Sequence, residues 1–149
     1  MRSTPKAKLR SALEVRISER RAKKCDALIY EVSAVLWTIS WPNEGSPLQV
    51  YIKAFQVFAL TALGITSAVF VFDRYYPNST KTHTRLLRQE KDGSSRQHIL
   101  KPDMLSLPRT CILGVTKNKE QLNKMLSDAL LDPEFYTVAT KQGNTLTIA

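Results

Sequence analysis

The sequence predicts an α/β fold with a mainly parallel central sheet. Residues 67–73 contain five consecutive apolar residues, mostly Val and Phe, followed by Asp73. Because apolar and polar residues do not alternate here, we expect a central strand that is covered on both faces. An earlier apolar stretch, 27–30, and a helical pattern over 47–63 complete a strand–helix–strand unit, which favours parallel pairing of the two strands.

The first strand is followed by a short helical or turn segment. Residues 27–30 are apolar and lead into Glu31, and residues 33–37 then predict a buried turn or helix start with Ser33 as its N-cap. Trp37 and Trp41 are interpreted as anchors in the core. The Pro, Gly and Asn content of residues 41–47 predicts a loop.

A helix is predicted from Pro47, in its first turn, to Leu63, with Gly64 as its stop. The residues expected on its apolar face recur at helical spacing, and they are Leu48, Ile52, Phe55, Phe58 and Ala62. Gln49, Lys53 and Gln56 share the opposite face.

Beyond Asp73 the pattern predicts more helix than strand. A turn over 77–80 leads into a basic helix over 81–90, while residues 97–115 fit no single element. Asn118 and Gln121 form a capping-box pattern at the start of a helix that Asp132-Pro133 ends. Residues 135–140 predict a strand, 142–144 a turn and 145–148 a last short strand.

Positive charge is concentrated in two regions. The chain of 149 residues has a net charge of +9, with +7 in residues 1–24 and +5 in residues 74–109. Residues 1–24 predict a basic tail or a marginal helix, and residues 25–149 a single domain. Such flanks suit a polyanion, either nucleic acid or anionic lipid, although a merely solvated basic surface has the same composition.

The cysteine content and the N-terminal residues favour an intracellular protein of the nucleus or cytoplasm. Cys25 and Cys111 are far apart and lack metal-ligand spacing, and no apolar run follows the basic start. Residues 20–24 resemble a nuclear-import signal. We see no zinc site and no phosphate-binding glycine loop, and we expect no small-molecule cofactor.

One alternative places part of the chain in a membrane. Residues 54–72 carry no charge and are apolar enough to suggest a single transmembrane helix. Against this stand Gln56 and the break at residues 64–67, and the basic residues on both sides would specify the orientation poorly.

The candidate site lies where parallel strands end. Glu31 and Asp73 follow the two predicted strands, so both are expected at the carboxyl edge of the sheet, where open α/β sheets gather their functional groups. Lys81, Arg85 and Arg88 share one face of the basic helix and could follow a phosphate backbone. A helix face that is merely solvated would show the same pattern.

Two segments together resemble a known family. Residues 33–37 (S-A-V-L-W), followed by F-D-R-Y at 72–75 and by Ser79, Lys81 and Thr84-Arg85, are similar to a large uncharacterised family of animal proteins associated with mobile elements. Residues 116–119 and 138–143 match the order of that family's later segments. The resemblance covers residues 25 to 146, and that family in turn resembles the PIN-like and flap-endonuclease-like 5′-nucleases.

The resemblance implies a three-layer PIN-like fold and a metal-dependent nuclease ancestry. Glu31 and Asp73 would be ligands of Mg²⁺ or Mn²⁺, and Lys81, Arg85 and Arg88 would contact the nucleic-acid backbone. Glu31 stands where the family has Asp, Val32 replaces a small residue, and the later acidic motifs E-E-A-D-T-R and D-T-D are absent. The chain therefore resembles the N-terminal half of such a domain.

Three functions follow as expectations. The first is a truncated or degenerate nuclease-like domain that binds nucleic acid weakly, holds no metal tightly and does not catalyse on its own. The second is the single-span membrane protein described above. The third is a non-catalytic protein-interaction module that self-associates through an exposed sheet edge.

Overall fold

The second strand is the centre of a three-stranded parallel sheet. The computed structural model describes residues 25–73 and 96–149. In it β2 (Ser67–Val71) lies between β1 (Ala27–Glu31) and β3 (Leu146–Ile148), and both pairings are parallel. The register pairs Glu31 with Val71, so the carboxyl ends of β1 and β2 meet at one edge of the sheet, as predicted. The α/β prediction and the last strand are confirmed.

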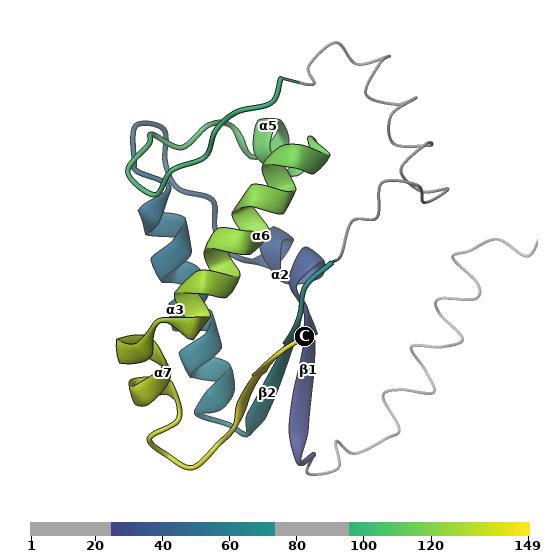
Figure 1. The fold of residues 1–149 in the computed structure, drawn as a ribbon, viewed down its shortest axis with the longest axis vertical. Helices are drawn as coiled ribbons and strands as arrows, with labels where there is room; N and C mark the ends of the chain where they lie inside the picture. The colour runs from purple at the N-terminus through teal and green to yellow at the C-terminus, as the bar shows by residue number, and fades with distance from the viewer. Residues whose placement is uncertain (1–24, 74–95) are drawn as a thin grey trace, which may run out of the picture.

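The helices that cover the sheet lie on one side of it (Figure 1). α2 (Val32–Thr38) follows β1 directly, and α3 (Gln49–Leu63) returns the chain to β2. In the second described range, residues 96–149, three helices precede β3: α5 (Arg109–Leu113), α6 (Thr116–Leu131) and α7 (Pro133–Ala139). The third layer that the resemblance implies is not found among residues 25–73 and 96–149.

The core is built from the helical faces that the sequence predicts. The buried residues of α3 include Leu48 at its N-cap, Ile52, Phe55 and Ala62, and those of α6 are Leu122, Leu126 and Leu130 with two asparagines. Phe70 of β2 belongs to the same core and contacts Phe55 and Phe58 of α3 edge to face. Gln56 of α3 lies toward α6, and its side-chain amide nitrogen, Nε2, donates to the carbonyl oxygen of Ala129 at 2.8 Å.

β2 is buried on one face only, which corrects the prediction that both faces are covered. Ala68 and Phe70 are buried, whereas Ser67, Val69 and Val71 are partly exposed. On β1 the same alternation leaves the Ile29 side chain 74% exposed. A run of Val and Phe suits a strand with one or two covered faces, so composition alone does not separate these cases.

Residues 135–140 form a helix and not the predicted strand. α7 begins at Pro133, and Asp132 is its N-cap, with a carboxylate oxygen that accepts a hydrogen bond from Phe135 N at 3.0 Å. Asp-Pro is both the end of α6 and the start signal of α7. This cap outweighs the strand propensity of the aromatic and β-branched residues that follow.

Three predicted caps and anchors are also wrong. Glu31, not Ser33, is the N-cap of α2, and Val115, not Asn118, is the N-cap of α6. Trp37 is 56% exposed, whereas Trp41 packs against Tyr51 with ring centroids 4.6 Å apart. In each case the side chain has a tertiary partner that local sequence does not reveal.

The predicted loops are confirmed by their glycines. Gly45 and Gly143 have φ angles of 83° and 84°, a region that glycine adopts without strain. Asn144, in the second of these loops, donates to the carbonyl of Leu63 at 2.6 Å and so satisfies one carbonyl at the end of α3.

Candidate functional site

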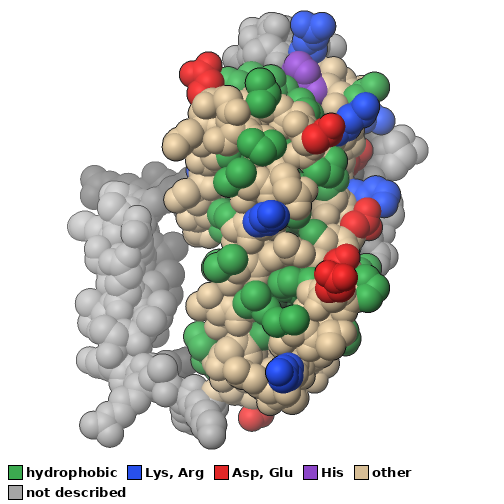
Figure 2. Space-filling model, turned by 90° about the vertical axis from the view of Figure 1, so that its left-hand side faces the viewer, with side chains coloured by type: hydrophobic (Ala, Val, Ile, Leu, Met, Phe, Trp, Pro, Cys, Tyr) green, Lys and Arg blue, Asp and Glu red, His purple; other side chains and the backbone are tan. Residues whose placement is uncertain are grey.

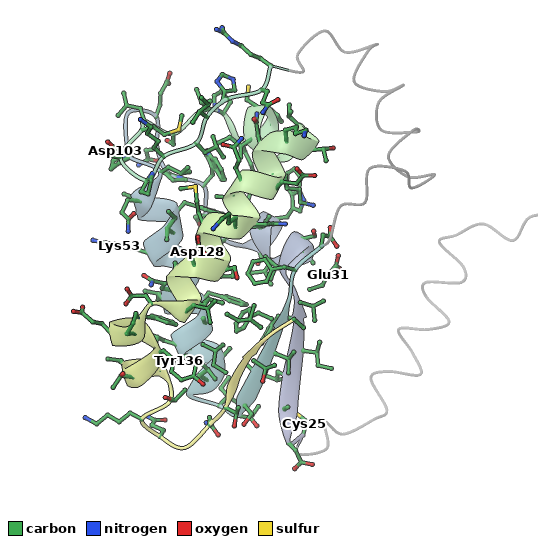
Figure 3. All side chains as sticks on the ribbon, viewed as in Figure 1. Cys25, Glu31, Lys53, Asp103, Asp128 and Tyr136 are labelled. Atoms are coloured by element: carbon green, nitrogen blue, oxygen red, sulfur yellow. The ribbon has the colours of Figure 1, made fainter. Side chains whose placement is uncertain are left out.

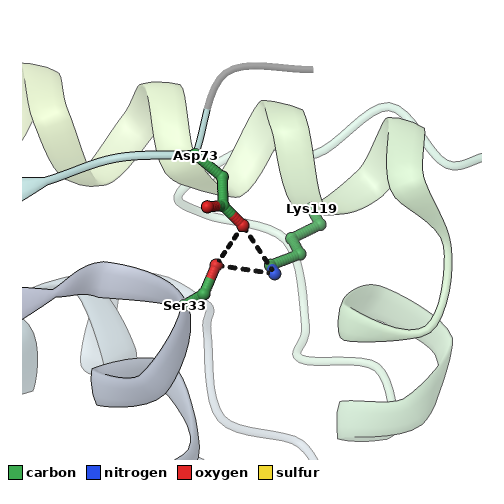
Figure 4. Close-up of polar contacts among 3 residues, drawn as sticks. All are labelled: Ser33, Asp73 and Lys119. Carbon is green, nitrogen blue, oxygen red and sulfur yellow. Dashed lines mark hydrogen bonds and ion pairs between the residues drawn. The ribbon is translucent and has the colours of Figure 1, made fainter. Parts of the chain in front are cut away.

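Three polar side chains from three elements meet at the carboxyl edge of the sheet (Figure 4). The Ser33 hydroxyl of α2 donates to Oδ2 of Asp73, just after β2, at 2.5 Å. Nζ of Lys119, in the first turn of α6, donates to Oγ of Ser33 at 2.8 Å and lies 3.6 Å from the same Asp73 oxygen. We call this group the Ser33–Asp73–Lys119 cluster.

The local sequence explains why the three residues converge. Glu31 pairs with Val71, so Ser33 and Asp73 each lie two residues beyond a matched strand position. Lys119 precedes the buried residues Leu122 and Leu126 by three and seven positions, which places it on the inward stripe of α6. Its side chain is accordingly only 14% exposed, against 36% for Asp73.

The hydrogen bonds of the cluster link three elements of the fold. Here the serine proton points to Asp73, while Lys119 donates to the serine oxygen. The cluster therefore joins α2, the end of β2 and the start of α6 through charge-assisted hydrogen bonds.

Within residues 25–73 and 96–149, the surroundings of Glu31 and Asp73 differ, and the metal centre that the resemblance implies stays a prediction. Glu31, at the end of β1 in Figure 3, shares a strand face with the exposed Ile29, while Asp73 contacts α2 and α6. The Lys119 ammonium lies 3.6 Å from Oδ2 of Asp73, so this carboxylate already has a positive charge beside it. Among the described residues no group of three or more His, Cys, Asp or Glu is arranged to hold a metal.

The three predicted backbone-contacting cations cannot be placed. Lys81, Arg85 and Arg88 lie in residues 74–95, outside the described ranges. Their role in binding stays a prediction from the sequence.

A pocket of about 400 Å³ opens beside Asp73. Its lining residues come from the ends of β2 and β3 and from one stripe of α6, and they include Phe72, Asp73, Glu120, Asn123, Lys124 and Ile148. Asn123 is only 6% exposed, yet neither its Oδ1 nor its Nδ2 has a hydrogen-bond partner. We call this the Asn123 pocket.

Sequence reasoning missed Asn123 and Lys119, although a signal for both was present. Asn123 precedes Leu126 and Leu130 by three and seven positions, the same spacing that places Lys119 on the buried stripe. A polar residue in register with buried leucines marks a polar group that must find a partner inside the fold.

A second polar centre, distant in sequence, stabilises the end of α2. Arg109 donates to the carbonyls of Leu36 and Ile39, and its guanidinium carbon lies 5.1 Å from the Trp37 ring centroid and 5.9 Å from that of Trp41. The Tyr51 hydroxyl also donates to Leu36 O, at 2.9 Å. Burial raises the pKa of Tyr51 to about 12, although the neighbouring Arg109 acts in the opposite direction.

The uncharged stretch 54–72 is divided between two elements. α3 ends at Leu63 and β2 begins at Ser67. Within the ranges that the structure describes, no helix has the length and apolar character needed to cross a membrane.

Comparison with protein-family models, with curated proteins and with solved structures finds no match to this chain.

Proposed function

We propose that this chain is a PIN-like α/β domain that binds nucleic acid and does not hydrolyse it. The observation that carries the proposal is the Ser33–Asp73–Lys119 cluster. Asp73 is the acid that a nuclease of this kind would use for a metal, and here it accepts a hydrogen bond from Ser33 beside a lysine ammonium. Hydrolysis by two metal ions needs such carboxylates as ligands of the metal ions.

The distribution of charge supports the binding half of the proposal. Residues 25–73 and 96–149 together hold eight Lys or Arg and nine Asp or Glu, so the excess of positive charge belongs to residues 1–24 and 74–95. The face that Figure 2 shows carries charges of both signs, with acidic and basic side chains next to one another along one edge. A near-neutral domain with basic segments suits binding to a phosphate backbone through those segments.

Fluorescence anisotropy of a labelled single-stranded 20-mer tests the binding. The full chain is titrated at several salt concentrations and compared with the triple variant Lys81→Ala, Arg85→Ala, Arg88→Ala. If the three cations contact three phosphates, the slope of log K against log salt falls by about 2 in the variant.

The matched control removes three positive charges elsewhere. Lys53, Lys101 and Lys141 are all exposed in the described domain, so their triple alanine variant changes the net charge equally. The proposal expects the control to retain the wild-type slope. Equal losses in both variants would mean that net charge alone drives binding, and an unchanged slope in the first would rule out the basic-helix contacts.

An incision assay tests the absence of hydrolysis. The chain is incubated with single-stranded and flap substrates in Mg²⁺ and in Mn²⁺, beside Asp73→Ala. We expect no cleavage above the level of the variant. Cleavage by the wild type that Asp73→Ala abolishes would contradict the proposal.

One observation favours a second function, an interaction module. Among the residues that the structure describes, β1 is an outer strand of the sheet; Ile29 on it is 74% exposed, and Val69 and Val71 of β2 are partly exposed. An open strand edge with apolar neighbours can pair with another chain. Light scattering after size exclusion should then show a dimer that Ile29→Lys dissociates, whereas a monomer at all concentrations would exclude this function.

A further inference from the structure

One face of the sheet carries apolar side chains that the described helices do not cover. β1 and β2 pair with Ile29 opposite Val69 and Glu31 opposite Val71, so these four side chains share one face, which we call the open face. Ile29 is 74% exposed, and Val69 and Val71 are partly exposed. The helices lie on the other side of the sheet (Figure 1). Because sheets bury their apolar faces against another element, this face calls for a covering segment.

An apolar stripe of matching length precedes β1 in the sequence. Leu9, Leu13 and Ile17 recur every four positions, which places them on one side of a helix. A helix rises about 1.5 Å per residue, so this stripe is about 12 Å long. The five residues of β1 span about 13 Å. Residues 1–24 lie outside the described ranges, so the match is one between their sequence and the open face.

The point where this segment joins the sheet indicates its direction. β1 begins at Ala27, so residues 18–26 are the whole connection between the stripe and the strand. A connection of this length is sufficient to reverse the chain between a helix and a strand. A helix antiparallel to β1 would end beside the start of that strand, and Leu9 would then lie toward the carboxyl edge, where Glu31 is exposed.

The charges of the segment and of the open face are complementary. Helical spacing places Arg10 and Arg16 on either border of the stripe. Their stems can cover apolar surface while the charged ends stay in water. Among the described residues of the open face, the charged side chain is the carboxylate of Glu31. This carboxylate favours a cationic occupant over an anionic surface such as a membrane.

We propose that residues 6–20 form a helix that docks Leu9, Leu13 and Ile17 on the open face. Isolated helices of this length are marginal in water, and docking supplies the tertiary packing that stabilises them. It also fixes the net charge of +7 in residues 1–24 against the sheet. The inference goes beyond the proposed nucleic-acid binding and does not depend on it.

Photo-crosslinking of the full chain tests the contact directly. A benzophenone amino acid is placed at position 29 or, as the matched control, at position 57, because Val57 is 61% exposed on α3. After irradiation at low protein concentration, gel electrophoresis separates crosslinks within one chain from those between chains, and mass spectrometry maps the attachment. The label at position 29 should attach within one chain to residues 9–17, and the label at position 57 should not.

Two crosslinking results would overturn the inference. Attachment from position 29 only between chains would mean that a second copy covers the open face. Attachment within one chain that avoids residues 9–17, or no attachment, would mean that the stripe does not dock there.

Hydrogen exchange tests the same inference without any change in the described domain. Amides of residues 9–17 should exchange at least about tenfold more slowly in the wild type than in Leu13→Asp, because docking buries three apolar side chains. Val15→Asp is the matched control: it adds the same charge to the same segment but lies off the stripe, so it should exchange as the wild type does. Equal exchange in the wild type and Leu13→Asp, or an equal loss of protection in both variants, contradicts docking through the stripe. Neither measurement contains nucleic acid, so a failure here leaves the proposed function intact.

Discussion

Two buried asparagines on α6 should respond in opposite ways to the same substitution. Asn118 is fully buried, and its amide accepts a hydrogen bond from His98 N at 2.8 Å and donates to the carbonyls of Arg96 at 3.1 Å and Cys111 at 2.9 Å. The side-chain amide of Asn123 is also buried, but neither of its polar atoms makes a hydrogen bond within the protein. Leucine has the same branched arrangement of side-chain heavy atoms as asparagine, so the substitution chiefly changes the polar contribution.

The expected magnitudes follow from these contacts. Asn118→Leu removes three hydrogen bonds and leaves a backbone N–H and two carbonyls without their partner, which costs about 2–4 kcal/mol in the free energy of unfolding. Asn123→Leu removes only an unsatisfied amide, so we expect no loss and a gain of about 1 kcal/mol. Urea unfolding followed by circular dichroism measures both, beside the exposed control Asn43→Leu.

Equal destabilisation by the two variants would refute this reasoning. It would mean that Asn123 has partners in solution that equal those of Asn118. A loss of stability in Asn43→Leu would show that the substitution itself, and not burial, determines the effect.

Three further predictions concern single contacts. Lys119→Met should lower the free energy of unfolding by about 1–3 kcal/mol because Asp73 loses a partly buried positive partner. A double-mutant cycle with Asp73→Asn should show that the two substitutions are coupled, and additive effects would contradict the contact. Asp132→Ala should cost about 1 kcal/mol through loss of the α7 N-cap, whereas Asp128→Ala, at an exposed ion pair on α6, should change stability by less than about 0.5 kcal/mol. The Tyr51 pKa is raised from 10.0 to about 12, so unfolding releases a proton between these values and stability should fall as pH rises from 10 to 12. Ultraviolet titration should show a late-titrating component that Tyr51→Phe removes; a titration curve that Tyr51→Phe leaves unchanged in shape would contradict the prediction.

The sequence was sufficient where a pattern was long or topologically constrained. The apolar periodicity of residues 47–63 predicts α3 to within two residues, and the strand–helix–strand order predicts the parallel pairing of β1 with β2. Both follow from backbone periodicity and from the few ways in which adjacent strands connect. The shared edge of Glu31 and Asp73 follows directly from that pairing.

The sequence was insufficient where a side chain is used by a distant segment. Asn118 and Gln121 have the spacing of a capping box, but they hold residues 96–100 against α6, with Gln121 accepting from Leu100 N at 3.0 Å. Ser33 likewise has the character of an N-cap and bonds to Asp73, forty positions later. Local rules describe what a polar side chain can do nearby, and tertiary contacts decide what it does.

The candidate site was predicted in position and not in composition. Asp73 is at the predicted edge, but its described partners are Ser33 and Lys119, and Glu31 takes part in neither contact. No pattern links Lys119 to Asp73 before the fold is known, because the pair depends on the packing of α6 across the end of β2.

The most direct measurement is anisotropy of a labelled oligonucleotide with the full chain, first in EDTA and then in Mg²⁺, with the oligonucleotide examined on a gel after each titration. Lys119 supplies a fixed positive charge beside Asp73, so we predict the same affinity in both buffers and an intact oligonucleotide. Binding or cleavage that appears only with Mg²⁺, and is lost in Asp73→Asn, would contradict a binding domain without a metal centre.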